Sequence, residues 1–156
     1  MQSQSKDAGK NKDLLNIKLL IEYDGSGYSG WQRQSDKPSV QEKIEKAISV
    51  LFGLENIKLY GAGRTDAGVH AFGQAANFRV SRAAFEKLGI DRFQHSLNAI
   101  LPPDIAVKDT KIAAESFHAR YSAKARIYKY YFAQGKRAVE GAKIFEVNYD
   151  IDLETA

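Results

Sequence analysis

The sequence predicts an α+β fold with a β-α-β-β-α-β order of elements, which is the ferredoxin-like arrangement that RNA-recognition modules also use. Helical segments alternate with short runs rich in branched aliphatic and aromatic residues. Glycine, aspartate and proline separate these segments along the 156-residue chain. We therefore expect a mainly antiparallel sheet with helices on one face, extra strands at the C-terminal end, and a second sheet face free to meet a ligand.

The first expected element is a strand over residues 16–23, which Asp24-Gly25 ends. After a loop rich in glycine and serine, the sequence predicts a helix that Gly53 ends. Ser39 followed by Glu42 forms a capping box at the start of this helix. Its apolar residues recur at helical spacing and predict one buried face: Val40, Ile44, Ala47, Ile48 and Leu51.

A second helical stretch, in one or two pieces, is expected over residues 81–101, where Pro102-Pro103 ends it. Further strands are expected at residues 56–61, 73–80, 104–113, 125–134 and 143–151. Residues 1–13 have the composition of a disordered tail, so one domain is expected over residues 14–156.

Composition argues against several classes of function. The chain has no cysteine, so it has neither disulfides nor thiolate chemistry. It has no signal-peptide core and no apolar run near the ~20 residues that cross a bilayer, so we expect a cytoplasmic protein that does not bind membranes. Its three histidines, His70, His95 and His118, lie far apart with no carboxylate cluster, so no metal site is expected.

Positive charge is concentrated near the C-terminal end. Residues 115–143 hold seven basic and two acidic side chains, a net charge of +5, whereas the whole chain carries +4. Four tyrosines (Tyr121, Tyr128, Tyr130 and Tyr131) lie among these bases. Basic residues mixed with aromatic ones suit a surface that binds phosphates and bases. The alternative is a solvated strand whose lysines protect a sheet edge.

The stretch GAGRTDAGVHA places Asp66 on a glycine-rich loop between two expected strands. Because a strand follows rather than a helix, a dinucleotide site is not expected here. Arg64 is near enough to fix the carboxylate, and the glycines Gly61, Gly63 and Gly68 would let another molecule approach closely. The alternative is ordinary turn chemistry, in which the carboxylate bonds its own backbone. Thr65 and Val69 are expected to be packing or turn residues.

GAGRTDAGVHA closely resembles the active-site motif of the TruA family of tRNA pseudouridine synthases. YDGSGYSGWQRQ, SVQEKIEKA and SFHARYSAKARIYKYYF resemble the family's other signatures, in the same order, over about residues 15–151. The resemblance implies the pseudouridine synthase fold, with residues 14–156 as the N-terminal catalytic domain. It also implies that tRNA is the partner, that uridine becomes pseudouridine in the anticodon stem-loop, and that no cofactor or metal takes part.

By this resemblance Asp66 is the catalytic aspartate. Arg64 pairs with it and helps to displace the target base, and Tyr128 lies against the uracil ring. The resemblance further suggests RNA-binding residues in the flanking segments: Arg33, Gly63, His118, Arg120, Lys124 and Arg126. For the basic residues among them, surface salt bridges are the alternative.

Full-length family members resemble two copies of such a unit and form homodimers. The sequence ends at NYDIDLETA, about where a second unit would begin, so we expect a fragment or a shortened protein that dimerises. Two other functions stay open from sequence. One is a catalytically silent RNA-binding module or tRNA chaperone, and the other is a structural or interaction domain.

Overall fold

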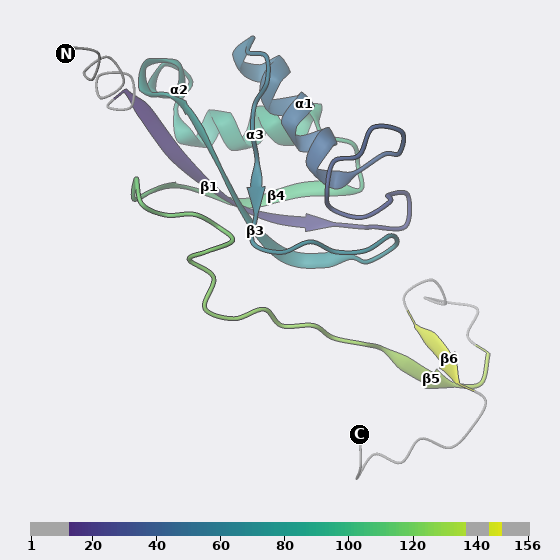
Figure 1. Cartoon of the computed structure of the whole chain (residues 1–156). Helices are drawn as coiled ribbons and strands as arrows, with labels where there is room; N and C mark the ends of the chain where they lie inside the picture. The colour runs from purple at the N-terminus through teal and green to yellow at the C-terminus, as the bar shows by residue number, and fades with distance from the viewer. Residues whose placement is uncertain (1–12, 137–143, 148–156) are drawn as a thin grey trace, which may run out of the picture. The chain divides into compact units, whose positions relative to one another are not determined.

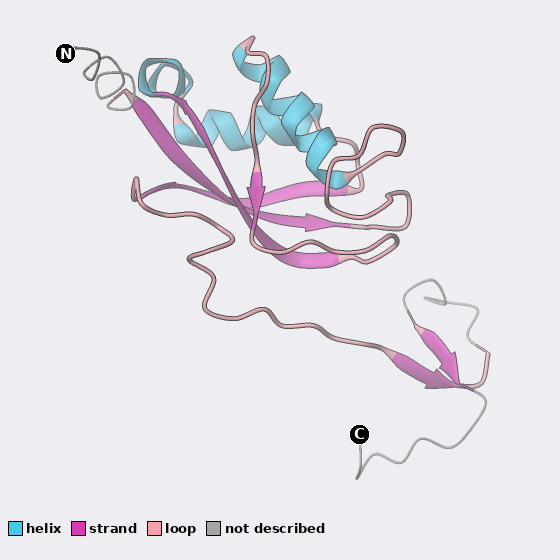
Figure 2. Cartoon of the chain, in the orientation of Figure 1, coloured by secondary structure: helices cyan, strands magenta, loops and turns pink. Residues whose placement is uncertain are grey.

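The computed structural model describes residues 13–136 and 144–147, which fall into two units divided after Lys124. The first unit holds a four-stranded sheet with three helices, and the second holds two short strands (Figures 1 and 2). The expected mixture of helices with a mainly antiparallel sheet is confirmed. Residues 1–12 of the expected tail lie outside the described residues.

The sheet of the first unit has the strand order β2-β3-β1-β4, and every neighbouring pair is antiparallel. Ile17 at the middle of β1 pairs with Phe78 on one side and Ile112 on the other. The central strand thus joins parts of the chain that are far apart in sequence. The strands are β1 (Leu14–Tyr23), β2 (Tyr60–Gly61), β3 (Ala71–Ser81) and β4 (Ile105–Ala113).

Three helices cover one face of this sheet (Figure 1): α1 (Val40–Phe52), α2 (Arg82–Leu88) and α3 (Ile90–Ile100). The Ser39 hydroxyl accepts a hydrogen bond from the Glu42 backbone N–H at 3.3 Å, which is one half of the expected capping box. Gly53 ends α1 in the left-handed conformation, as expected. The second helical stretch forms two helices joined at Gly89.

The core lies between the helices and the sheet. Alternate residues of β1 are buried on the helix side, among them Ile17, Leu19 and Ile21, none of which is exposed to solvent. Phe93 of α3 lies 5.3 Å from the ring of Phe85, measured between ring centroids. Each fully buried side chain of this size stabilises the fold by roughly 1.5–3 kcal/mol.

The opposite face of the sheet is only partly open. Asn16 and Asn77, which lie on this face, hydrogen-bond to the segment that follows β4. Figure 1 shows this segment passing across the sheet on the side away from the helices. The expectation of a free second face is therefore wrong where residues 114–119 cover it.

The expected strand over residues 56–61 is reduced to Tyr60–Gly61, because side chains of α1 occupy the backbone groups of Leu59. Leu59 N–H donates to Glu45 Oε1 and Leu59 C=O accepts from Gln41 Nε2, both at 3.0 Å. These groups are therefore not available to a sheet ladder.

The two strands of the second unit are also shorter than expected. β5 (Phe132–Gln134) and β6 (Phe145–Val147) pair in parallel. Residues 125–131, which were expected to be part of a strand, are not in one. Residues 143 and 148–151 of the last expected strand lie outside the described residues.

Candidate active site

Hydrogen bonds of Thr65 to the protein interior hold the loop between β2 and β3 in place. The Thr65 hydroxyl lies 2.8 Å from the Tyr23 hydroxyl, and the Thr65 carbonyl accepts from the Trp31 backbone N–H at 3.1 Å. Its neighbours Arg64 and Asp66 are both exposed. The packing role expected of Thr65 is confirmed, and it leaves the side chains on either side available at the surface.

The Asp66 carboxylate does not cap its own turn. Val69 N–H donates instead to the Asp66 backbone carbonyl at 3.3 Å, which confirms Val69 as a turn residue. Within residues 13–136 and 144–147, no hydrogen bond or ion pair involves the carboxylate of Asp66 or the guanidinium of Arg64. The carboxylate is therefore open to a ligand, and its pairing with Arg64 stays a prediction.

Two glycines bring the loop against the segment Asp24–Trp31. Gly30 has φ of 98°, and a Cβ there would lie 2.4 Å from the Thr65 carbonyl oxygen. A Cβ on Gly61 would lie 2.6 Å from Cε2 of the Trp31 indole, which is buried. The expectation that Gly61 leaves room for RNA is therefore wrong, because the protein's own Trp31 fills that space.

Tyr28 supports the same loop from a second point. Its backbone carbonyl accepts from Gly68 N–H at 3.2 Å, and its hydroxyl donates to Asp104 Oδ1 at 2.7 Å. Burial, together with the hydrogen bond to the Asp104 carboxylate, raises the pKa of Tyr28 above its ordinary value. The hydroxyl thus stays protonated and keeps donating across the neutral range.

Arg33 lies in an ion pair with Glu45 of α1, at 3.3 Å between Nη1 and Oε2. The Glu45 side chain is only 7% exposed, whereas that of Arg33 is 56% exposed. The structure thus contains the surface salt bridge that was the alternative for Arg33. The contact of Arg33 with RNA stays a prediction. Sequence reasoning did not single out Glu45, because it lies beside the predicted apolar face and its partners Arg33 and Leu59 come from outside the helix.

Two buried asparagines hold the segment Ala114–Ser122 on the sheet. Asn16 Nδ2 donates to the carbonyls of Ala114 and Phe117, at 2.9 and 2.8 Å. Asn77 Nδ2 donates to Asn16 Oδ1 at 2.9 Å, and Asn77 Oδ1 accepts from Ala119 N–H at 2.8 Å. Every polar atom of both side chains is thereby satisfied. Sequence reasoning missed this pair, because its partners are distant in the chain.

The other predicted RNA contacts are distributed over both units. Gly63 is half-buried, and its carbonyl accepts from Gln74 Nε2 at 2.6 Å. His118 accepts at Nδ1 from Arg120 N–H at 3.2 Å, and Lys124 is exposed. His118, Arg120 and Lys124 all lie on the short segment that follows β4.

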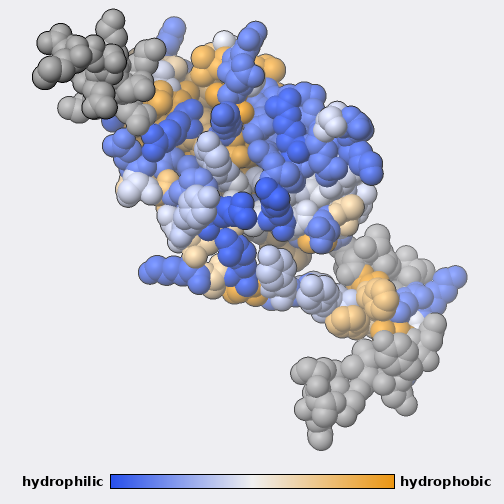
Figure 3. Space-filling model, viewed as in Figure 1, coloured by the Kyte–Doolittle hydropathy of each residue, from blue (hydrophilic) through white to orange (hydrophobic). Residues whose placement is uncertain are grey.

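Arg126 and Tyr128 belong to the second unit, so the RNA contact of Arg126 and the place of Tyr128 against the uracil ring stay predictions. Tyr128 is 58% exposed there. In Figure 3 hydrophobic side chains lie at the surface of this unit, where Phe132 and Phe145 are both more than half exposed. An exposed apolar surface of this kind is typical of a face that meets another protein surface.

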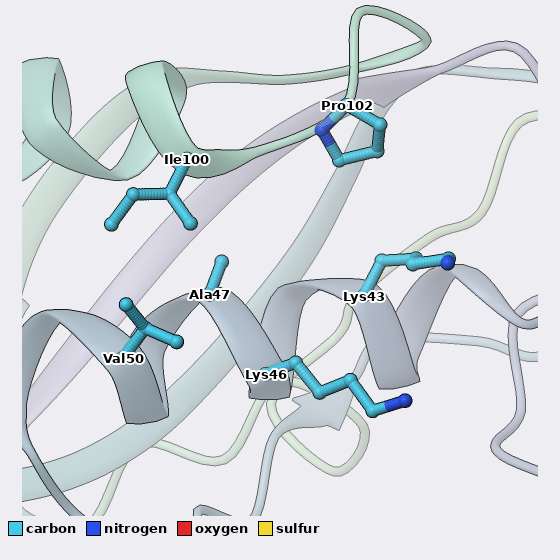
Figure 4. Close-up of a pocket in the computed structure, with 6 residues that line it drawn as sticks. All are labelled: Lys43, Lys46, Ala47, Val50, Ile100 and Pro102. Atoms are coloured by element: carbon cyan, nitrogen blue, oxygen red, sulfur yellow. The ribbon is translucent and has the colours of Figure 1, made fainter.

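A cavity of about 300 Å³ lies between α1 and the end of α3 (Figure 4). Ala47 and Val50 of α1 face Ile100 of α3 across it, and two lysines of α1 also line it. It contains none of the predicted site residues, so it adds nothing to the candidate site. In the part of the chain that the structure describes, no group of acidic and histidine side chains is placed to hold a metal ion, and no helix could span a membrane.

Comparison with known proteins places this α+β domain in one protein family. Residues 19–122 match the family model described as tRNA pseudouridine synthase. A tRNA pseudouridine synthase A of Acetivibrio thermocellus is 44% identical over 91% of this chain and 57% of its own length. A protein of the same name from Chlorobium phaeobacteroides is 49% identical over 83% of this chain and 50% of its own length.

The chain therefore belongs to the tRNA pseudouridine synthase family. It spans about half the length of the curated relatives it matches.

Proposed function

We propose that the protein isomerises uridine to pseudouridine in the anticodon stem-loop of tRNAs. The observation that carries this proposal is the Asp66 carboxylate, which is exposed on a loop that Thr65, Tyr28 and Gly30 hold in place. Family membership and the relatives' name, tRNA pseudouridine synthase A, support the same reaction. In this proposal the four-stranded unit is ferredoxin-like, and residues 14–156 serve as the N-terminal catalytic domain.

The reaction breaks the bond from ribose C1′ to uracil N1 and forms a bond from C1′ to uracil C5. The proton leaves C5 and N1 gains one, so no electrons are transferred and no energy donor is consumed. We therefore propose that the enzyme uses neither cofactor nor metal. As in glycoside hydrolysis, a carboxylate acts beside an electron-poor anomeric carbon. One carboxylate suffices because the leaving uracil delocalises its own negative charge.

In this scheme Asp66 acts in its ionised form. It either attacks C1′ as a nucleophile or removes a sugar proton to give a glycal-like intermediate. A carboxylate enclosed with its substrate keeps its charge only beside a cation, and Arg64, two residues before it, supplies that cation. The same exposed guanidinium enters the space that the displaced base leaves. Tyr128 covers the uracil ring and helps to exclude water, which would otherwise hydrolyse the sugar intermediate.

RNA binding in this proposal uses residues on both sides of the loop. Displacing the target uridine from its stack costs a few kcal/mol, and phosphate contacts offset that cost. The residues proposed for these contacts are Arg33, Gly63, His118, Arg120, Lys124 and Arg126. Arg33 serves with its exposed guanidinium while Glu45 fixes its position.

The proposed enzyme works in the cytoplasm as a homodimer of full-length chains. In them, the part of the protein that the relatives have and this chain does not match completes the pocket. The exposed Phe132 and Phe145 support a contact of the second unit with further protein surface.

The direct test is incubation of the full-length protein with unmodified tRNA, without added metal or nucleotide. Mass spectrometry after pseudouridine-specific labelling should locate the product in the anticodon stem-loop. Salt-sensitive tRNA binding without any product would instead support the silent RNA-binding module. Absence of both product and tRNA binding would support a structural domain.

A further inference from the structure

We infer that Tyr60, His118 and Tyr121 form a stacking site for an unpaired nucleobase of the bound RNA. The ring centroids of Tyr60 and His118 lie 4.8 Å apart, with their planes at 48°. Those of His118 and Tyr121 lie 4.5 Å apart, at 37°. The three rings therefore form a continuous row, with His118 in the middle. This inference rests on the proposed function, since it names where that RNA is held.

The row ends in an exposed ring. Tyr121 is 80% exposed, and Tyr60 at the other end is 42% exposed. Aromatic side chains of this size are normally buried in large part, so a tyrosine that packs against a tilted neighbouring ring yet stays open to solvent offers a π-face to a ligand. Stacking a nucleobase on such a face stabilises binding without sequence preference.

Hydrogen bonds of the backbone fix the positions of the residues that carry the three rings. Tyr60 lies on β2 opposite Asn77, and Asn77 itself bonds the backbone of Ala119, next to His118. The His118 backbone N–H donates to Ser122 Oγ at 3.1 Å, and Ser122 N–H donates to the His118 carbonyl at 2.8 Å. The rings are thus presented by a preorganised backbone, which lowers the entropy lost on binding.

The surroundings favour RNA over a protein partner. Between residues 114 and 124, as the structure describes them, Tyr121 is the only large hydrophobic side chain that is exposed. The centre of a protein interface is typically more apolar than this segment, whose other exposed side chains are small, polar or charged. Arg120 and Lys124 flank Tyr121 and give the segment positive charge suited to phosphates.

The position of the row also agrees with the proposed reaction. Tyr60 lies on β2, and the loop that carries Asp66 begins directly after this strand. When one uridine leaves its stack, the bases beside it lose a stacking partner. A base stacked on Tyr121 would regain part of that energy.

The test replaces Tyr121 by Phe, Leu and Ala in the full-length protein. Binding is measured with unmodified tRNA and with a single-stranded oligouridylate that contains one 2-aminopurine, whose fluorescence falls when it stacks. Tyr121→Phe should bind within about twofold of the original protein and quench equally. Tyr121→Leu and Tyr121→Ala should bind roughly 5- to 150-fold more weakly, with less quenching. The dependence of affinity on salt should stay unchanged, because no phosphate contact is removed.

Equal binding and quenching by the Leu and Phe variants would overturn the inference, because it would show that apolar area and not a π-face is needed. Unchanged binding in all three variants would overturn it as well. Thermal unfolding checks that each variant folds. If these variants behave normally while Asp66→Asn loses activity, the stacking site fails and the proposed function stands. If stacking is seen but the original protein makes no pseudouridine, the catalytic proposal alone fails.

Discussion

Thr65 decides how the two charged side chains beside it are presented. Its hydroxyl and carbonyl are bonded to Tyr23 and Trp31, so the chain cannot turn this residue outward without losing both bonds. Arg64 and Asp66 point to the surface as a result. A catalytic carboxylate needs this kind of rigid support, because small errors in position lower the rate strongly.

Gly30→Ala should move the loop that carries Asp66. The new Cβ would lie 2.4 Å from the Thr65 carbonyl oxygen, and the backbone φ of 98° is strained for alanine. We expect a loss of roughly 2–4 kcal/mol in the free energy of unfolding and a lower kcat in the full-length enzyme. Denaturant titration and single-turnover kinetics measure the two effects.

Gly53→Ala is the matched control for this change. Gly53 also has a positive φ, 62°, but a Cβ there meets nothing within 4 Å. It should cost only about 1 kcal/mol and leave kcat unchanged. Equal effects of the two substitutions on kcat would show that contact with Thr65 does not matter for catalysis.

Tyr28→Phe should destabilise the protein by about 1–3 kcal/mol at neutral pH, because Asp104 loses a buried donor. The pKa of Tyr28 is raised by folding, so its contribution is fully present below the unfolded value of 10.0 and decreases as the pH rises above it. The gap in the free energy of unfolding between the original protein and the variant should therefore be constant at neutral pH and shrink above pH ~10. A gap that persists unchanged at higher pH would contradict the assigned hydrogen bond.

At the scale of elements, Glu45 joins α1 to the loop before it and to the segment before β2. Glu45 receives hydrogen bonds from Leu59 just before β2, from Gln41 on its own helix and from Arg33 on the preceding loop. The helix itself was predictable, since its cap and apolar face are local patterns. The shortness of β2 was not, because it depends on which distant side chain takes the Leu59 backbone groups.

In the second unit, too, the lengths of the strands could not be predicted from the sequence. Its strand-like pattern over residues 125–134 correctly indicated β5, but only where Phe132–Gln134 finds β6 as a neighbour. A strand needs a partner, and an alternating sequence does not say where one is. In the candidate site, the motif named Asp66 and Arg64, whereas the packing of Trp31 on Gly61 and the asparagine pair are contacts between distant segments.

Asn77→Ala should release the segment Ala114–Ser122 from the sheet. It leaves Ala119 N–H and Asn16 Oδ1 without their present partner, at a cost of roughly 2–4 kcal/mol. Hydrogen–deuterium exchange of this segment should become markedly faster, and tRNA affinity should fall. Asn98→Ala is the control, because Asn98 also makes two hydrogen bonds, both to Val107. Faster exchange of the segment in both variants would mean that global stability, rather than the asparagine pair, holds it.

At the scale of the whole molecule, the distribution of charge bears on the proposed binding of RNA. Positive charge is concentrated in residues 115–143, which carry a net charge of +5 and include Arg120 and Lys124. The affinity for tRNA should therefore fall as salt is raised. Lys124→Gln should reduce the slope of log affinity against log salt by about 0.7–0.9, if it contacts one phosphate. Lys87→Gln, an exposed lysine on α2, should leave the slope unchanged; an equal change in both would contradict a localised RNA surface.

The most direct test of the central claim is the amount of pseudouridine that full-length protein with Asp66→Asn forms in unmodified tRNA. The substitution keeps the shape of the side chain and removes its charge. We predict that product formation falls at least about a thousandfold while tRNA binding stays within about twofold. Asp91→Asn, which changes another exposed aspartate on α3, should be as active as the original protein. Pseudouridine formed at a normal rate by Asp66→Asn would contradict the role of this carboxylate in the reaction.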